Sequence, residues 1–296
     1  MPATQMKQRI TFRNILFATD FSSAANSAMP HAASLARSFD SKLFAMHVKE
    51  PIDYAVPPEM WASAEQACEM ELQQLRDSMN RDFPELKPEV LESEGGLWPA
   101  LVSAVEKYKI DLIVVGTRGR TGIGKALLGS QAEEILRYAP CPVLTIGPKA
   151  VFEEETRGKL TSVLCATNFG PASLAAANIA VSLAEENQCR LTLLHVIEKR
   201  SVNELFNAEE FGESSERHLR ELVPEEANSW CAPHFLVEMG VPTDKILEVA
   251  HRIHAGMIVL GVHTPEGVPG AATHLPIATV HHIVAHAACQ VLTVPG

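Results

Sequence analysis

The chain has 296 residues, about twice the length of a usual domain, so its length favours two domains. With 46% hydrophobic residues each half can bury a core, which excludes a disordered chain. The net charge of −11 argues against broad, sequence-independent nucleic-acid binding, and most of it falls in residues 151–296, which hold 9 basic against 18 acidic residues.

Short apolar runs alternate with segments of helical period along the first half of the chain. The run at residues 14–18 lacks polar alternation, which predicts a strand buried on both faces. Small residues at helical spacing predict a helix over 23–38, with Ser22 or Ser23 as its N-cap. The remaining pattern predicts strands at 42–48, 88–94, 110–115 and 143–146, a loop at 51–58, and helices at 61–81, 98–108 and 130–138. This alternation is typical of α/β folds, so we expect a doubly wound, five-stranded parallel sheet with helices on both faces.

The same pattern returns in the second half of the chain. Residues 15–21 (Ile-Leu-Phe-Ala-Thr-Asp-Phe) reappear at 163–169 as Val-Leu-Cys-Ala-Thr-Asn-Phe. Without a gap, residues 15–50 match residues 163–198 at 14 of 36 positions. The sequence therefore predicts two tandem domains of one fold, at 1–150 and 160–296, joined by a linker at 151–159.

Targeting signals are not evident in the sequence. No stretch approaches the roughly 18 apolar residues that span a bilayer, and no apolar segment follows the basic residues of Met1–Ile10. The six cysteines form no CxxC pair and are too sparse for a disulfide scaffold, so we expect small buried hydrophobes. We therefore expect a cytoplasmic protein with no membrane partner.

In doubly wound sheets, ligands bind beyond the carboxyl ends of the strands, where the strand order reverses. That rule points to Thr19–Asp20, Val48–Glu50 and the glycine-rich loop Gly116–Ser130, which follows a buried strand and opens a helix. Glycines let backbone N–H groups approach an anion, and a helix N-terminus adds free donors. The loop therefore predicts a phosphate site, and the alternative is a surface loop whose glycines only serve turns.

One part of this loop matches a different motif. Gly119 through Lys125 fits the start of a P-loop, but Ala126 stands where a P-loop has the Ser or Thr that holds Mg²⁺. The segment also follows the fourth predicted strand rather than the first. We interpret the match as a coincidence.

The spacing Gly116-x₂-Gly119-x₉-Gly129-Ser130 resembles the nucleotide-binding signature of the universal stress protein family. The flanking residues 18–22, 47–48 and 139–143 agree with the family pattern in the same order. The resemblance covers nearly the whole chain, as a tandem member with two domains. It implies the universal stress protein fold, which is like that of the adenine nucleotide alpha hydrolases.

The resemblance also implies an ATP site in the first domain, with Mg²⁺ as a further candidate. Asp20, beside Thr19 at the end of the first strand, would lie next to the nucleoside, and the backbone of Val48 would meet the adenine edge. The family positions for ribose and phosphates fall on Gly116, Arg118, Gly119, Gly129, Ser130 and the N–H of Gln131. The family often has a second hydroxyl where this chain has Ala132, a loss on the order of 1 kcal/mol. Without a ligand, Asp20 would be a helix N-terminal carboxylate and Val48 a strand end.

The second copy departs from this pattern. Asn168 replaces the acidic residue, Thr264 replaces Gly119, and Ile277-Ala278 stand where Gly129-Ser130 would fall. The intervening loop contains Pro265, Glu266 and Pro269, which remove N–H donors or add negative charge. We predict that this half binds no nucleotide by the family mode.

Histidines are the other chemically capable side chains. His282 and His286 lie four residues apart and would share a helix face, as zinc ligands can, but no cysteine or carboxylate pattern supports them. His47 and His195 occupy equivalent strand ends and are interpreted as structural. We find no GxSxG or HExxH motif and predict neither a catalytic residue nor a metal ligand.

Three functions remain open at this point. The first is an ATP-binding regulatory protein of the stress response, with at most slow ATP hydrolysis. The others are an ATP-using hydrolase or transferase, and a nucleotide-independent interaction module. The family commonly pairs domains through the last strand, which here would join Val143–Ile146 to Val291–Val294 within the chain; whether two chains pair further is left open.

Overall fold

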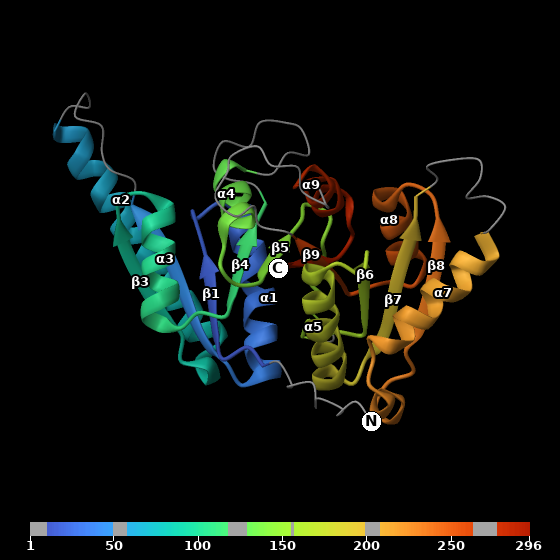
Figure 1. The fold of residues 1–296 in the computed structure, drawn as a ribbon. Helices are drawn as coiled ribbons and strands as arrows, with labels where there is room; N and C mark the ends of the chain where they lie inside the picture. Colours follow the sequence, from blue (N-terminus) through green and yellow to red (C-terminus); the bar gives the residue numbers. More distant parts are fainter. Residues whose placement is uncertain (1–10, 50–57, 118–128, 155–156, 199–207, 263–276) are drawn as a thin grey trace. The chain divides into compact units, whose positions relative to one another are not determined.

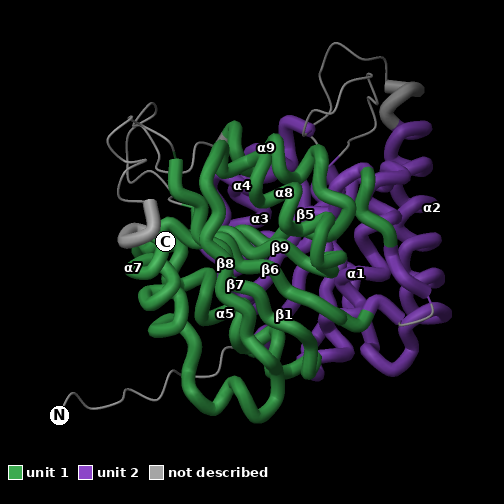
Figure 2. The backbone as a smooth tube through the Cα atoms, turned by 90° about the vertical axis from the view of Figure 1, so that its right-hand side faces the viewer, with its two compact units in different colours: residues 1–11, 149–151, 159–296 green, residues 12–148, 152–158 purple. Residues whose placement is uncertain are grey.

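The computed structural model describes residues 11–49, 58–117, 129–154, 157–198, 208–262 and 277–296. The chain forms two compact units, drawn in different colours in Figure 2. We call the unit made of residues 12–148 and 152–158 the N-terminal unit. The unit that consists mainly of residues 159–296 is the C-terminal unit.

In the N-terminal unit, strands and helices alternate along the chain (Figure 1). The elements are β1 (Asn14–Ala18), α1 (Ser23–Phe39), β2 (Lys42–Lys49), α2 (Pro58–Asp82), the 3₁₀ turn η1 (Pro84–Leu86), β3 (Glu89–Glu94), α3 (Leu97–Tyr108), β4 (Leu112–Gly116), α4 (Ser130–Tyr138) and β5 (Val143–Ile146). The strands lie in the order β3-β2-β1-β4-β5, and neighbouring strands are parallel. The predicted five-stranded, doubly wound sheet is confirmed.

The order of strands fixes where a ligand can bind. The chain runs from β1 outward to β2 and β3, then returns to place β4 on the other side of β1. Strand order thus reverses between β1 and β4, which leaves a crevice beyond their carboxyl ends. Ile15, Leu16 and Phe17 of β1 are fully buried, as expected of a strand covered on both faces.

Helix α1 begins where the sequence predicts a cap. The Ser22 side chain accepts a hydrogen bond from the Ala25 N–H at 3.2 Å, which identifies Ser22 as the N-cap. At the other end Asp40 takes a left-handed conformation, φ +52°, and its N–H bonds the carbonyls of the last turn. Helix α2 begins at Pro58, inside the expected loop, because proline is tolerated in the first turn of a helix.

The C-terminal unit repeats this plan. Its elements are β6 (Ser162–Thr167), α5 (Pro171–Asn187), β7 (Arg190–Ile197), α7 (Ala208–Glu221), the 3₁₀ turn η2 (Glu225–Ser229), β8 (His234–Met239), α8 (Pro242–Arg252), β9 (Met257–Val262), α9 (Ile277–His286) and β10 (Gln290–Pro295). The strand order within this unit is β10-β9-β6-β7-β8, again with parallel neighbours. Both halves of the chain therefore have the same α/β architecture.

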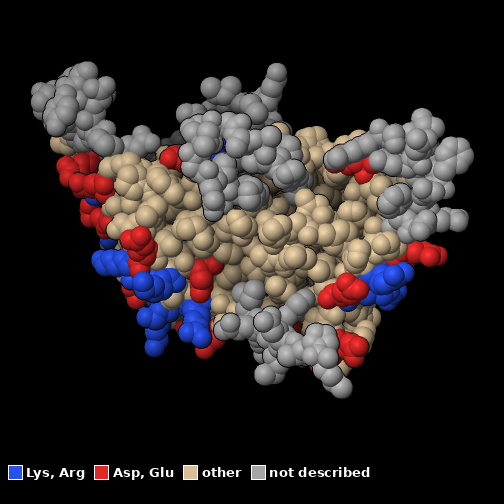
Figure 3. Space-filling model, viewed as in Figure 1, with Lys and Arg blue, Asp and Glu red and all other residues tan. Residues whose placement is uncertain are grey.

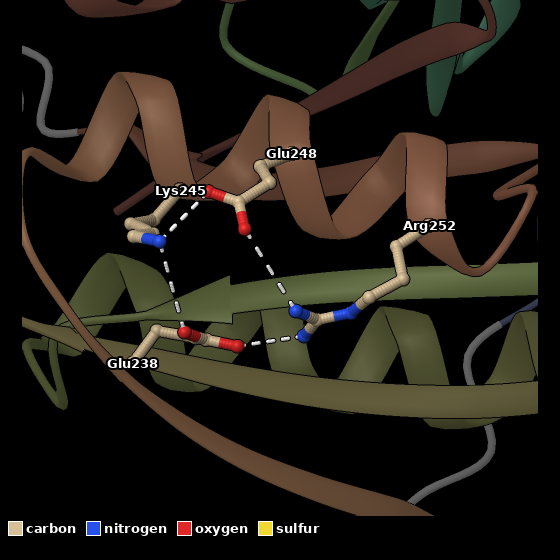
Figure 4. A network of polar contacts seen from close by, with 4 residues as sticks. All are labelled: Glu238, Lys245, Glu248 and Arg252. Atoms are coloured by element: carbon tan, nitrogen blue, oxygen red, sulfur yellow. Dashed lines mark hydrogen bonds and ion pairs between the residues drawn. The ribbon is translucent and has the colours of Figure 1, made fainter.

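Ion pairs tie α8 to the edge strand β8 (Figure 4). Glu238 on β8 contacts Arg252 at 2.6 Å and Lys245 at 4.0 Å, and the two cations also contact Glu248. All four side chains remain partly open to solvent, so each pair taken alone contributes little to stability. We infer that these ion pairs help to hold α8 against β8.

Charges on the described surface are of both signs. On the face drawn in Figure 3, acidic and basic side chains are interspersed rather than gathered into a continuous basic band. Among the helices of the described residues, none has the length and apolar character needed to cross a bilayer.

Candidate functional site

A pocket of about 450 Å³ opens in the N-terminal unit, at the carboxyl ends of β1, β2 and β4. Helices α3 and α4 complete its walls. It is lined by Ala18, Thr19, Asp20, Ala25, Met46, His47, Val48, Leu97, Leu101, Val115, Gly116, Gly129, Ser130, Gln131, Ala132 and Ile135. This is the crevice that the reversal of strand order predicts, and its volume lies in the range of small-molecule sites.

The pocket brings together most of the residues that the sequence singles out. Its lining includes Thr19, Asp20, Val48, Gly116, Gly129, Ser130 and Gln131. Arg118 and Gly119 were also predicted to line the site, but they lie outside the described residues, as do Arg120 and Lys125. The residues that meet here come from four separate stretches of the chain.

The turn between β1 and α1 holds Asp20 in place. Phe21 has φ +61°, and its N–H donates to the Thr19 side-chain oxygen at 3.0 Å. The Ser22 N–H donates to Asp20 Oδ1, also at 3.0 Å. One carboxylate oxygen thereby orients Asp20, while Oδ2 has no hydrogen bond to any residue that the structure describes. The half-buried carboxylate can accept hydrogen bonds from a ligand through this second oxygen.

His47 fastens the end of β2 to the end of β1. Its Nδ1 lies 2.9 Å from the Thr19 carbonyl oxygen, which can only accept, so Nδ1 carries the proton. The Phe21 ring lies against the imidazole, with ring centroids 4.3 Å apart. The Thr19 N–H also donates to the Met46 carbonyl oxygen at 2.9 Å. These contacts support the structural interpretation of His47.

Gly116, the last residue of β4, lies directly against the start of α1. A Cβ built on Gly116 would come within 2.3 Å of the Ala24 carbonyl oxygen and 2.8 Å of the Ala25 nitrogen. Because those atoms belong to the backbone, no side-chain rotation can make room. A glycine here lets β4 and α1 approach closely at the floor of the pocket.

The first turn of α4 lines the pocket with Ser130, Gln131 and Ala132. Gly129 is its N-cap and supplies no side-chain acceptor, and Ser130 and Gln131 follow it. The Gly129 N–H donates to the Thr117 carbonyl oxygen at 2.8 Å, which joins the two ends of the glycine-rich loop. The Thr117 hydroxyl is buried and has no hydrogen-bond partner among the described residues. This corner of the pocket is suited to an anion.

The pocket also has apolar lining residues, which we call the apolar wall. It is formed by side chains from β2, α3 and α4, namely Met46, Leu97, Leu101 and Ile135. These four residues form no motif in the sequence, although the apolar spacing of the predicted helix over 98–108 indicates that this helix buries one face. A pocket with one apolar wall and a few convergent polar groups is typical of small-molecule sites.

The equivalent turn of the C-terminal unit has the same backbone geometry but a different side chain. Phe169 has φ +63°, and His195 Nδ1 lies 2.9 Å from the Thr167 carbonyl oxygen. Asn168 replaces the carboxylate, and its Oδ1 accepts from both the Gly170 N–H at 3.0 Å and the Ser173 hydroxyl at 2.8 Å. The substituted residues Thr264, Pro265, Glu266 and Pro269 lie outside the described residues, and Ile277 begins α9.

The paired histidines of α9 stack on each other. The rings of His282 and His286 lie 4.3 Å apart, and His286 Nδ1 lies 2.8 Å from the His282 carbonyl oxygen. Within the part of the chain that the structure describes, no group of three or more His, Cys, Asp or Glu residues could hold a metal ion. His263 and His274, which the sequence places near this helix, lie outside the described residues.

Comparison with known proteins gives consistent matches over both halves of the chain. The model of the universal stress protein family matches residues 11–147 and again residues 159–295. A universal stress protein of Methanocaldococcus jannaschii is 32% identical over 144 residues, which are 46% of this chain and 82% of that protein. One of Mycolicibacterium smegmatis is 26% identical over 277 residues, covering 90% of this chain and 92% of its own.

Solved structures agree on the fold. A universal stress protein from Archaeoglobus fulgidus has a TM-score of 0.69 at 17% identity, and the match covers 95% of this chain and 98% of that one. At this identity the likeness concerns the fold alone. Together with the two matches to the family model, it leads to one conclusion. The chain belongs to the universal stress protein family, as a member that carries the family's domain twice.

Proposed function

We propose that the N-terminal unit binds ATP in this pocket and that the protein is an ATP-binding regulatory protein of the cytoplasmic stress response. The observation that carries the proposal is the convergence of Asp20, Val48, Gly116 and the first turn of α4 on one pocket of about 450 Å³. The pocket offers an apolar wall, a carboxylate and an anion-binding corner. A nucleotide needs these three environments for its base, its ribose and its phosphates.

The base would lie against the apolar wall. Met46, Leu97 and Leu101 offer a surface on which a planar ring can be buried. Val48 lies near the carboxyl end of β2, two residues after Met46. Backbone groups at a strand end can hydrogen-bond the edge of a base without a charged side chain. This supports the assignment of Val48 to the adenine edge.

The ribose would meet Asp20. Because Oδ1 is held by the Ser22 N–H, the carboxylate has a fixed orientation before any ligand arrives. Oδ2 then accepts from a hydroxyl group of the sugar. A charge-assisted hydrogen bond of this type contributes about 1.5–3 kcal/mol.

The phosphates would lie at the first turn of α4. The N–H groups of Ser130 and Gln131 start a helix whose N-cap, Gly129, has no side chain to shield them. The buried hydroxyl of Thr117 stands beside the same loop end and lacks a partner among the described residues. Arg118 and Gly119 are assigned to the ribose and phosphates from the sequence alone.

Mg²⁺ would bind in this pocket only together with the phosphates of ATP. Asp20 is the one carboxylate among the residues that line the pocket, and Mg²⁺ is often held by substrate phosphates and water with one or two carboxylates. The ion would supply charge neutralisation to the phosphates. Because Asp20 is assigned to the ribose, water would complete the coordination of the ion.

The C-terminal unit is proposed to bind no nucleotide by this mode. The Asn168 amide is neutral, and its oxygen is already shared by two donors of its own turn, the Gly170 N–H and the Ser173 hydroxyl. It therefore lacks both the charge and the free acceptor that Asp20 offers. We assign this unit a structural or interaction-bearing role.

Calorimetric titration of ATP with Mg²⁺ into the full chain tests the proposal. We expect binding that weakens by about tenfold or more in Asp20→Ala and stays unchanged in the matched variant Asn168→Ala. AMP and GTP in the same experiment separate the contribution of the phosphates from that of the base. Binding that is absent in the wild type would overturn the proposal, and it would favour a nucleotide-independent interaction module.

Phosphate release over time, measured on the same protein, distinguishes nucleotide binding from catalysis. A regulatory protein should release little phosphate over many hours, whereas an ATP-using hydrolase or transferase should turn over many equivalents once its second substrate is present. A steady release of phosphate at many equivalents per chain would replace the regulatory role by an enzymatic one. The distinction does not depend on where ATP binds.

Pairing of the two domains is the remaining part of the proposal. Within their own units β5 and β10 are edge strands, and exposed edges are commonly covered by another strand. We assign them to each other, with domains at 1–150 and 160–296 and a linker at 151–159. Pairing within the chain leaves open whether two chains also form a homodimer, and analytical ultracentrifugation measures which of the two forms is present.

A further inference from the structure

Strand β8 is the last strand of the sheet in the C-terminal unit, and among the described residues only β7 is paired with it (Figure 1). Directly after β8, the Gly240 N–H donates to the Ile197 carbonyl oxygen of β7 at 3.0 Å. Backbone groups of successive residues point alternately to the two sides of a strand. The N–H and C=O groups of Phe235, Val237 and Met239 therefore point away from β7. A free edge of this kind can accept a further strand.

The N-terminal unit contains the equivalent edge strand, β3. His47 and His195 hold the same position in their units, and they are paired with Glu92 of β3 and Val237 of β8. The Gly95 N–H donates to β2, so the outward backbone groups of β3 belong to Val90, Glu92 and Glu94. Two of these three residues carry a carboxylate, and charged side chains on an edge strand oppose pairing with another chain. The three equivalent residues of β8 are apolar, so β8 lacks this protection.

The apolar side chains of β8 are incompletely buried. Leu236, Val237 and Met239 are partly exposed, whereas Leu193 and Leu194 of the neighbouring strand β7 are buried. Removing apolar surface from water is favourable. A partner that covers these side chains would therefore gain free energy in addition to the backbone hydrogen bonds of the edge.

The charge at β8 is balanced within the unit. The single carboxylate of the strand, Glu238, contacts Arg252 at 2.6 Å and Lys245 at 4.0 Å. On the other face of the strand, the Arg220 guanidinium lies over the Phe235 ring, 4.7 Å from its centroid. The edge thus fits an apolar strand with little charge of its own, and β8 itself is such a strand.

The sequence of β8 suits pairing with its own copy. Two copies related by a twofold axis would pair in antiparallel orientation, with outward backbone groups opposite each other. This condition allows a register with Val237 opposite its own copy and a register with Phe235 opposite Val237 of the second copy. Neither register sets like charges against each other, and the second sets His234 against Glu238 of the second copy. The first register, applied to β3, would set Glu92 against Glu92.

We propose that two copies of the chain pair through β8, so that the sheet of the C-terminal unit continues from one chain into the other. The outward N–H and C=O groups of Phe235, Val237 and Met239 bond to the second copy. The partly exposed apolar side chains of the two strands then cover one another. Strand β3 takes no part, because its carboxylates repel a second copy.

Sedimentation velocity of the full chain at increasing concentration, together with hydrogen–deuterium exchange, tests the proposal. We expect a monomer that converts to a dimer as the concentration rises. Amide exchange in β8 should slow as the dimer forms, whereas exchange in β3 should not change. A chain that stays monomeric throughout, or a dimer in which β8 exchanges as fast as in the monomer, would overturn the proposal.

Two substitutions at Val237 assign the interface. Val237→Glu introduces the residue that stands at the equivalent position of β3, and Val237→Pro removes an outward N–H without removing a hydrogen bond to β7. Each should raise the dissociation constant of the dimer about tenfold or more. The matched control Val90→Glu, on β3, should sediment as the wild type does.

Circular dichroism of each variant shows whether the fold is kept, and the exchange of β8 in the wild type decides the question if a variant does not fold. A dimer that persists in both folded Val237 variants would show that the chains pair elsewhere, and the proposal would be wrong. None of these readouts involves ATP. The outcome is therefore independent of the proposed function.

Discussion

Substitution of Gly116 by alanine should damage both the stability of the N-terminal unit and its affinity for ATP. The added Cβ would lie 2.3 Å from the Ala24 carbonyl oxygen, 2.6 Å from its carbon and 2.8 Å from the Ala25 nitrogen. These atoms form the first turn of α1, which also carries the Ser22 cap and follows directly on Asp20. The clash can be relieved only by moving this turn away from β4.

The size of both effects follows from the geometry. Restoring an ordinary contact asks for a shift of about 1 Å, and overpacking of this kind costs typically 1–3 kcal/mol. A shift of the α1 turn moves Asp20 and the floor of the pocket by a similar distance. Losing one or two hydrogen bonds to the ligand, each worth about 1 kcal/mol, would weaken ATP binding about five- to thirtyfold.

Gly261 at the end of β9 provides a matched control. A Cβ there would lie 2.3 Å from both the Ala172 carbonyl carbon and the Ser173 nitrogen, the equivalent turn of α5. Gly261→Ala should therefore destabilise the chain by a similar amount and leave ATP binding unchanged. The comparison separates a loss of stability from a loss of the site.

The assay is urea unfolding together with calorimetric titration of ATP for both variants. A chain of two units need not unfold in one step, so midpoints of the transitions are compared rather than extrapolated free energies. Equal loss of ATP affinity in Gly116→Ala and Gly261→Ala would show that Gly116 has no specific role in the site. An unchanged midpoint in Gly116→Ala would show that the close contact with α1 does not limit the size of this residue.

Three further substitutions test the site and its frame. Gly129→Val should weaken ATP binding by about tenfold or more. The N-cap has φ −64° and ψ 149°, which valine can adopt, but the branched side chain would block the backbone donors of the helix start. Unchanged affinity in calorimetry would contradict the placement of the phosphates. Asp20→Asn should lose most of the affinity for ATP that Asp20→Ala loses, because an amide oxygen can accept a hydrogen bond but carries no negative charge. Affinity equal to that of the wild type would show that the carboxylate of Asp20 does not contact the ligand. Asp111→Asn should lower the free energy of unfolding by about 1–3 kcal/mol and leave the affinity for ATP unchanged. The Asp111 carboxylate accepts hydrogen bonds from the Arg13 N–H at 2.7 Å and the Asn14 N–H at 3.1 Å, at the start of β1 and not at its pocket end. A changed affinity in calorimetry would show that these hydrogen bonds also support the site.

The sequence predicts the elements of the N-terminal unit to within a few residues, because buried parallel strands and amphipathic helices leave separate patterns. The 3₁₀ turn Pro84–Leu86 escapes such analysis, since three residues carry no periodicity. The sequence predicts a loop at 51–58, whereas α2 begins at Pro58, because a proline in the first turn of a helix looks the same in sequence as a proline that ends a segment.

The polar residues of the candidate site were selected by the reversal of strand order and by the family pattern. The apolar wall was not, because Met46, Leu97 and Ile135 are far apart in the sequence and meet only once strands and helices are assembled.

The proposed function requires that a single ATP binds in the N-terminal unit, and native mass spectrometry of the full chain with ATP and Mg²⁺ counts the bound nucleotides. We expect one nucleotide per chain, retained in Asn168→Ala and lost in Asp20→Ala at the same ATP concentration. Two equivalent nucleotides per chain, or one that disappears in Asn168→Ala and remains in Asp20→Ala, would contradict it.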